Sequence, residues 1–180
     1  MKCENCDGST QIMTEASYHY VESGLDNVYL KNVTVRVCES CGEKSLRIPR
    51  ILALHATLGK AVAMQPCPLR GSDIRFLRKQ LKLSARHWAA LLRTDISTLS
   101  RWENSQQVVG AQSDTLIRLL YFRIRDEQEG ALTKESVTEA VREIKSDCVV
   151  HLSVNVNRPD TYQYQTIVTN STDLKPLLPA

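Results

Sequence analysis

The stretch Lys82–Gln106, KLSARHWAALLRTDISTLSRWENSQ, predicts two short helices joined by a tight turn. Ser84 and Asp95 belong to the residue types that precede the first turn of a helix, because their side chains accept backbone N–H groups there. Large apolar residues then recur at helical spacing, which predicts that the two helices pack against each other across the turn. These residues are Trp88, Leu92, Leu99 and Trp102, with the small Ala89 where the helices cross most closely.

This arrangement is that of a helix-turn-helix, whose second helix enters the major groove of DNA. With Leu99 and Trp102 turned inward, four residues of the second helix are left near the turn or facing outward: Ile96, Ser97, Ser100 and Arg101. Arg101 has no acidic residue at i,i+4 spacing within the helix, so a bidentate contact with guanine O6 and N7 is favoured over an ion pair.

The charge of the chain supports an anionic partner for this region. The net charge is only +3, but residues 71–125 hold ten Lys/Arg against four Asp/Glu, whereas residues 126–180 hold five against nine. A cationic segment fits a polyanion, and a solvated basic face is the alternative.

The helix-turn-helix stretch is part of a predicted four-helix bundle over residues 72–125. Each helix has a candidate N-cap followed by an apolar stripe. The caps are Ser72, Ser84, Asp95 and Asp114.

Cysteine spacing predicts a metal site in the N-terminal part of the chain. Cys3-x2-Cys6 and Cys38-x2-Cys41 are separated by 31 residues. Four thiolates complete the closed tetrahedral shell of structural zinc, so we expect one non-catalytic zinc ion per chain. A redox dithiol is the main competitor. Two alternating runs, residues 10–21 and 27–38, predict antiparallel strands that bring the cysteine pairs together, with Val33, Val35 and Val37 on one face.

The sequence therefore predicts an α+β multidomain chain. A small β-rich zinc domain spans residues 1–65 and ends in an apolar helix that starts at Pro49. Residues 66–71, rich in proline, form a linker. The all-α helix-turn-helix bundle spans 72–125. The remaining cysteines, Cys67 and Cys148, stand alone and are interpreted as unpaired thiols.

Residues 126–180 form the last predicted segment, a C-terminal helix plus β-hairpin extension. A hinge at RDEQEG leads to a helix capped by Thr133, two alternating runs at 148–157 and 161–170 form a hairpin, and the last ten residues are expected to be disordered. The hairpin could add strands to a partner's sheet, complete the sheet of the zinc domain or form a dimer contact.

Several functional classes lack any sequence signal. The chain has no G-x-S-x-G, no H-E-x-x-H and no phosphate-binding glycine loop, so it is not expected to be an enzyme. No apolar run spans a membrane and no signal peptide precedes the cysteines, so a cytoplasmic protein without a membrane partner is expected.

The segment from about Ile74 to Phe122 resembles the Xre/Cro-type helix-turn-helix family, whose signature is close to STLSRWENS with a glycine at Ser105. The resemblance implies base contacts from Ile96, Ser97 and Arg101. It implies phosphate contacts from Ser84, Ala85, Arg86, Asn104, Gln106 and Gln107. Two positions depart from the family. Ala85 stands where the family has a glutamine that contacts a phosphate, and Arg86 could supply that contact instead. Arg93 stands where the family has the turn glycine. It is expected either to adopt a left-handed conformation beside DNA or to force a different turn.

The cysteine pairs, their order before the helix-turn-helix and the SRWEN motif together resemble the MqsA/YgiT antitoxin family. This resemblance covers Met1 to about Phe122. It implies an antitoxin of a type II toxin-antitoxin system whose zinc domain binds a cognate toxin, commonly an mRNA-cleaving ribonuclease. It also implies a homodimer that represses its own operon. We predict that this homodimer binds palindromic double-stranded DNA whose half-sites are one helical turn, ~34 Å, apart. The alternative is a zinc-containing transcriptional regulator without a toxin.

Overall fold

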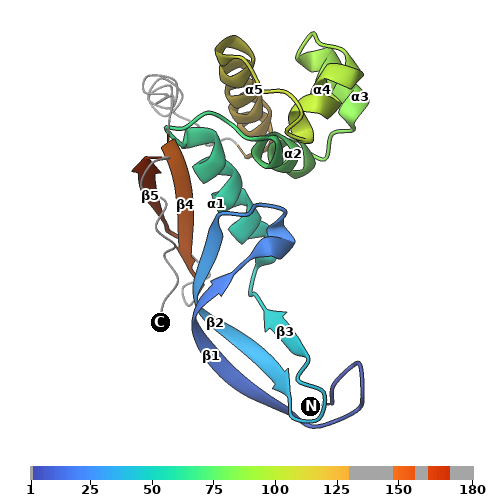
Figure 1. The fold of residues 1–180 in the computed structure, drawn as a ribbon, viewed down its shortest axis with the longest axis vertical. Helices are drawn as coiled ribbons and strands as arrows, with labels where there is room; N and C mark the ends of the chain where they lie inside the picture. The colour runs from blue at the N-terminus through green and yellow to red at the C-terminus, as the bar shows by residue number, and fades with distance from the viewer. Residues whose placement is uncertain (1, 130–147, 157–161, 171–180) are drawn as a thin grey trace.

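The computed structural model describes residues 2–129, 148–156 and 162–170, and within them it forms one β-sheet and a set of helices (Figure 1). The strands are β1 (Thr10–His19), β2 (Val28–Cys38), β3 (Lys44–Arg47), β4 (Cys148–Asn155) and β5 (Tyr164–Asn170). A short 3-10 turn, η1 (Val21–Ser23), lies between β1 and β2. The helices are α1 (Ile51–Met64), α2 (Gly71–Gln80), α3 (Ala85–Leu91), α4 (Ile96–Glu103) and α5 (Ala111–Glu129). The chain is therefore mixed α+β.

The long strand β2 organises the sheet. It pairs antiparallel with β1 along its whole length, from Thr10 opposite Cys38 to His19 opposite Tyr29. On its other side, β2 pairs with β3 near its C-terminal end and with β4 near its N-terminal end. The two strands predicted between the cysteine pairs are thus confirmed. Val33 and Val35 are fully buried, as their alternation predicted, while Val37 is half-buried.

The C-terminal strands complete the sheet that the N-terminal strands begin. β4 and β5 form the predicted antiparallel pair, with Val150 opposite Val168. β4 then pairs parallel with β2, so that Val28 lies opposite Leu152 and Leu30 opposite Val154. Of the three roles considered for the hairpin, completing the N-terminal sheet is the one that the structure contains.

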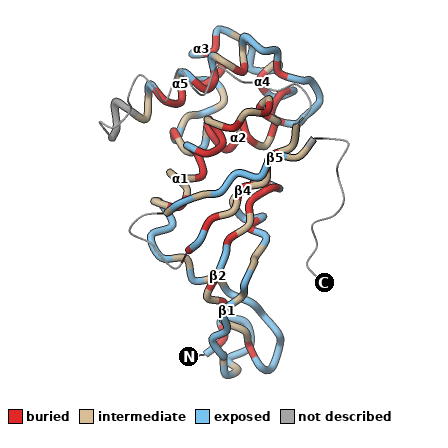
Figure 2. Tube along the Cα trace, turned by 90° about the vertical axis from the view of Figure 1, so that its left-hand side faces the viewer, coloured by how far each residue is buried: buried red, intermediate tan, exposed pale blue. Residues whose placement is uncertain are grey.

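Helix α1 lies between the sheet and the helices α2 to α5 (Figure 1). Its residues Leu54, Leu58 and Val62 are completely buried, and they belong to the same apolar core as Leu152 of β4 and Ile117 of α5. The buried segments in Figure 2 run from the sheet through α1 into the helices. The end of the sheet next to the N-terminus of the chain is mostly exposed. One continuous core therefore connects the sheet to the helices.

Several expected helix boundaries differ from the observed ones. Helix α1 starts at Ile51, two residues after Pro49, and its N-cap Arg50 has a φ of 47°. Ser72 does not cap α2, because the N-cap is Arg70, whose backbone N–H donates to Asp73 at 2.9 Å. The hinge expected at RDEQEG is, as far as Glu129, instead the last part of α5. The helix expected after Thr133 and the last ten residues lie outside the described residues.

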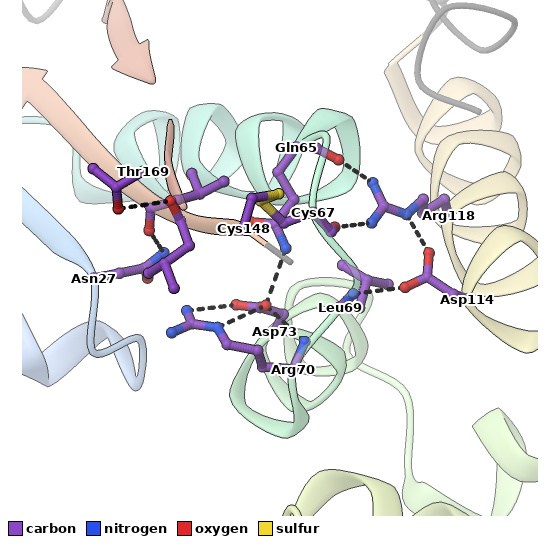
Figure 3. Close-up of a disulfide and its surroundings, with 12 residues drawn as sticks. Asn27, Gln65, Cys67, Leu69, Arg70, Asp73, Asp114, Arg118, Cys148 and Thr169 are labelled. Atoms are coloured by element: carbon purple, nitrogen blue, oxygen red, sulfur yellow. Dashed lines mark hydrogen bonds and ion pairs between the residues drawn. A yellow bond between two sulfur atoms is a disulfide. The ribbon is translucent and has the colours of Figure 1, made fainter. Parts of the chain in front are cut away.

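Asp114 also has a different role from the expected cap. Helix α5 begins three residues before it, and its carboxylate accepts hydrogen bonds from the Leu69 backbone N–H at 2.6 Å and from Arg118 Nε at 2.5 Å. Arg118 is completely buried and donates to the carbonyl oxygens of Ala63, Gln65 and Cys67. The segment that connects α1 to α2 is therefore bonded to α5 (Figure 3).

Cys67 and Cys148 are not unpaired thiols, which corrects the sequence interpretation. They form a disulfide across 81 residues of sequence, with their Cα atoms 5.5 Å apart (Figure 3). The two residues meet because the start of β4 lies beside the segment that follows α1. No local spacing in the sequence indicates this pairing.

Candidate metal centre and candidate nucleic-acid interface

Two similar loops hold the four remaining cysteines. In the first, the Asp7 N–H donates to the Cys3 carbonyl and the Cys3 N–H donates to the Gly8 carbonyl. In the second, Gly42 and Cys38 repeat this pattern, with the Cys38 N–H donating to the Glu43 carbonyl. Asp7 and Gly42 occupy equivalent positions and both have a positive φ, 57° and 70°. Each loop thereby directs its two thiols to the same side.

The antiparallel pairing of β1 and β2 brings the loops together. Cys6 Sγ lies 3.4 Å from Cys38 Sγ, and Cys3 Sγ lies 3.8 Å from Cys41 Sγ. All four sulfur atoms lie within 4.8 Å of one another. Sulfurs at the corners of a tetrahedron with metal–sulfur bonds of ~2.3 Å would be about 3.8 Å apart. The four cysteines are thus positioned to hold one metal ion.

Gly8 allows this close approach of the loops. A Cβ atom at Gly8 would lie 2.6 Å from Ser40 Oγ and 3.2 Å from Cys38 Sγ. A side chain at this position would require the side chains of Ser40 and Cys38 in the second loop to shift. The sequence CENCDG contains this glycine, but its packing role depends on the opposite loop and has no local signal.

The metal-free thiols differ in acidity. A hydrogen bond from the Cys41 backbone, assisted by one from Ser40, lowers the pKa of Cys38 to about 6. The Gly8 backbone acts to lower the pKa of Cys6, but thiol hydrogen bonds with Cys38 and Cys41 outweigh it and raise this pKa to about 12. Near neutral pH, the lowered pKa favours the thiolate form of Cys38, whereas metal binding to Cys6 would release a proton.

The second candidate site is the pair formed by α3 and α4. The apolar residues that were expected to join these helices are all buried, namely Trp88, Ala89, Leu92, Leu99 and Trp102. The Ser84 hydroxyl accepts the His87 N–H at 3.2 Å, as expected of a cap, whereas Asp95 occupies the N-cap position of α4 without a side-chain bond. Inward packing of the two helices thus agrees with the apolar spacing.

The ten residues expected to contact DNA all lie on the surface. Each is exposed, whereas Ala85 is half-buried. The ten are Ser84, Arg86, Arg93, Ile96, Ser97, Ser100, Arg101, Asn104, Gln106 and Gln107. Three of them are arginines, and none of these forms an ion pair within the described residues. The α3–α4 pair therefore presents uncompensated positive charge together with short polar side chains.

Arg101 and Asn104 differ in how freely they can engage a ligand. Arg101 Nη2 donates to Thr98 Oγ1 at 3.1 Å, a neutral contact that leaves its charge uncompensated. Asn104 is already bonded inside the fold, since its amide donates to the Ser100 carbonyl at 2.9 Å and accepts from Arg75 Nη2 at 2.5 Å. Asn104 therefore helps to fix the end of α4.

Sequence reasoning missed the buried carboxylate of Glu103. Its oxygens accept from Arg78 Nε at 2.6 Å and Nη2 at 2.8 Å, and Arg75 Nε lies 3.6 Å away. These contacts tie α4 to α2. The partners are separated by 25 residues or more, so no helical spacing could reveal them.

The backbone at the two positions where the Xre/Cro-type family usually has glycine has a positive φ. Arg93 has a φ of 54° and Ser105 a φ of 56°. The left-handed conformation expected of Arg93 is thus present, at a conformational cost of ~1 kcal/mol relative to glycine. Both turns around α4 are made without glycine.

Comparison with known proteins gives no match: no family model, no curated protein and no solved structure is similar to this chain. Within the described residues, no helix combines the length and the apolar character needed to cross a membrane.

Proposed function

We propose that this protein is a DNA-binding antitoxin, which uses α3 and α4 as a helix-turn-helix to repress its own operon and its four-cysteine end to hold a partner toxin. The observation that carries the DNA-binding part is the division of α4 into a buried side, with Leu99 and Trp102, and an exposed side, with Ile96, Ser97, Ser100 and Arg101. The resemblance to the MqsA/YgiT family supports the toxin-binding part. The protein has no enzymatic role in this proposal and acts in the cytoplasm.

The chemistry of the exposed side of α4 suits the major groove. Serine hydroxyls bind either base edges or phosphates, and a guanidinium without an ion-pair partner can donate two bonds to guanine. The exposed Ile96 can contact a thymine methyl group. Phosphate contacts from Ser84, Arg86, Arg93, Gln106 and Gln107 would fix the orientation of α4 on the duplex.

The DNA-binding part is tested by the substitution Arg101→Ala. We expect weaker binding to the operator by ~1–3 kcal/mol and relaxed preference at one base pair per half-site, because the guanine contact is lost. The matched control is Lys60→Ala, which removes an exposed positive charge from α1. The measurement is fluorescence anisotropy with operator variants at fixed salt concentration. Equal weakening on every sequence would make Arg101 a phosphate contact instead.

The two candidate sites lie at opposite ends of the molecule, with the N-terminus and its cysteine loops at one end and α3 and α4 at the other (Figure 1). This separation would allow a toxin and an operator to be bound at the same time. In the proposal, zinc holds the two loops in place, and a homodimer spans the two half-sites of a palindrome.

The toxin-binding part is tested by co-purification with the product of an adjacent short reading frame. We expect a small basic ribonuclease-like protein to elute with the full-length chain, and its ribonuclease activity to be suppressed in the complex. If no such protein binds, the chain is a zinc-containing transcriptional regulator, which the α4 surface supports equally well.

A further inference from the structure

The disulfide between Cys67 and Cys148 joins two parts of the fold that the chain itself connects only indirectly. Cys67 belongs to the segment between α1 and α2, and Cys148 is the first residue of β4. Cys67 carries the chain into the helices α2 to α5, and β4 lies inside the sheet. The bond is therefore a covalent connection between the helices and the sheet.

Each side of the disulfide is also held by other contacts. On the helical side, Arg118 donates to the Cys67 carbonyl at 2.6 Å and Asp114 accepts the Leu69 N–H. On the sheet side, Asn27 Nδ2 donates to the Val150 carbonyl at 2.6 Å, and Leu152 is completely buried. Opening the disulfide would consequently loosen the connection without removing either part from the core.

The chain contains two sets of cysteines with opposite redox requirements. Cys3, Cys6, Cys38 and Cys41 are free and must be thiolates to hold a metal ion. Two of their sulfur atoms lie only 3.4 Å apart, so sustained oxidation would convert these thiols to a disulfide. Conditions that keep this cluster reduced are also conditions in which a disulfide can be opened. A cytoplasmic location, which rests on the proposed function, would make a permanent disulfide rarer still.

We propose that Cys67 and Cys148 form a reversible redox pair, opened by a low-molecular-weight thiol and closed by the corresponding disulfide, which controls how tightly the helices are tied to the sheet. The pair would respond over a range in which the four-cysteine cluster stays reduced. The position of the proposed DNA-reading helices relative to the sheet would then depend on the thiol balance.

The chemistry of opening is two successive exchanges. The thiolate of the small thiol attacks Cys148 Sγ, which is on the half-buried and hence more accessible residue, whereas Cys67 is only 3% exposed. The disulfide breaks, a mixed disulfide forms at Cys148, and Cys67 leaves as a thiolate that takes up a proton. A second thiolate attacks the small-molecule sulfur and releases Cys148. Two thiols are oxidised to one disulfide while the protein disulfide is reduced to two thiols.

The test uses the full-length, metal-loaded protein in mixtures of reduced and oxidised glutathione. Alkylation and mass spectrometry give the fraction of closed pair, metal content reports the cluster, and hydrogen exchange reports residues 65–69 and 148–155. We expect reversible opening at constant metal content, with exchange in these two segments faster by about tenfold or more in the open form. The variant Cys148→Ser should show the faster exchange at every glutathione ratio.

Four results would overturn the proposal. They are a pair that stays closed in excess reduced glutathione without denaturant, a pair that never closes in oxidised glutathione, opening that requires metal loss, and unchanged exchange in the open form. Should Cys148→Ser fail to fold, the comparison between open and closed wild-type protein still decides. These readouts need neither DNA nor toxin, so the proposed function can fail while the redox pair stands, and the reverse also holds.

Discussion

The carboxylate of Glu103 is buried, with its side chain only 7% exposed, and two arginines of α2 compensate its charge. Arg78 is the closer partner and is itself 14% exposed, whereas Arg75 is 42% exposed and lies farther away. The hydrogen bond with Glu103 raises the pKa of Arg78, so this arginine is charged at any ordinary pH. The Arg78–Glu103 pair is thus the closer of the two ion pairs that join α2 to α4.

We expect the substitution Arg78→Ala to lower the free energy of unfolding by about 3 kcal/mol, because it leaves Glu103 buried without its closest partner. The matched variant Arg75→Ala removes the exposed arginine and should cost less than about 1 kcal/mol. Urea denaturation followed by the fluorescence of the buried Trp88 and Trp102 measures both values. Equal losses in the two variants would contradict the assignment of Arg78 as the main partner.

A histidine in α1 makes stability depend on pH. His55 Nε2 lies 2.9 Å from Tyr20 Oη, and burial lowers the pKa of His55. The unfolded chain therefore binds a proton at a higher pH than the folded chain does. Stability from this residue is complete above the ordinary histidine pKa of ~6.5 and is lost as the pH falls through the lower, folded value.

We expect His55→Gln to flatten the decrease in stability between about pH 7 and pH 5, since glutamine can bond to Tyr20 but does not titrate. Thermal denaturation across this range is the measurement. The variant His87→Gln, at an exposed histidine of α3, is measured beside it as the control substitution. An unaltered slope in His55→Gln would mean that other groups cause the pH dependence.

Single residues also mark where sequence reasoning succeeds and where it fails. The left-handed backbone of Arg93 was one of two expectations for this position, because the turn between two short helices needs a positive φ. The pairing of Cys67 with Cys148 was not expected, because it depends on how β4 approaches the segment that follows α1. Local conformation follows from neighbouring residues, whereas contacts across 81 residues depend on the whole fold.

At the scale of single elements, the two cysteine loops lie at one end of the strands that connect them. The loops contribute few apolar contacts, since Cys6 and Cys41 are exposed. The opposite end of β2, around residues 28–31, is held by pairing with β4. Metal binding is therefore expected to stabilise the loop end of the sheet more than the rest.

We expect Cys38→Ser to reduce metal content from about one ion per chain to nearly none, because three thiols cannot close the tetrahedral shell. Hydrogen exchange should then rise at the two loops and at the adjoining strand ends, but not at residues 28–31. Cys148→Ser, which removes a cysteine far from the cluster, is the control and should retain the metal. Undiminished metal content in Cys38→Ser would exclude this site.

The elements themselves were largely predictable, and their ends were not. Alternation predicted β1, β2, β4 and β5, and apolar spacing predicted the helices. The observed helix ends differ from the expected ones where a side chain bonds to a distant group. Asp114 does not cap α5, because its carboxylate binds Leu69 and Arg118. Candidate caps identify where a helix can begin, and tertiary contacts decide among them.

At the scale of the whole molecule, the sheet is built from two distant parts of the sequence. Residues 10–47 supply β1, β2 and β3, and residues 148–170 supply β4 and β5. The parallel pairing of β2 with β4 has no sequence signal, because any alternating strand could occupy that edge. The candidate metal ligands were identified from spacing, but the place of the C-terminal strands could only be left among three alternatives.

The shared core predicts that substitutions of two apolar residues in the C-terminal strands lower the free energy of unfolding by very different amounts. Leu152 is completely buried in β4, and Ile167 is 47% exposed in β5. Leu152→Ala should lower the free energy of unfolding of the entire chain by about 2–5 kcal/mol, and Ile167→Ala by less than about 1 kcal/mol. Denaturation monitored by circular dichroism measures both. Similar small effects would mean that the C-terminal strands are not part of the core.

The interrupted sheet also has a consequence for how the protein is made. Strand β2 leaves the ribosome well before β4, with residues 39–147 synthesised in between. At ~5–20 residues per second, this delay is roughly 5–20 s. Helices α1 to α5 are synthesised during that interval, while the β2 edge at residues 28–31 still has no partner strand. Each nascent chain thus passes through a stage in which this edge is open to another strand, and pairing with β4 ends that stage.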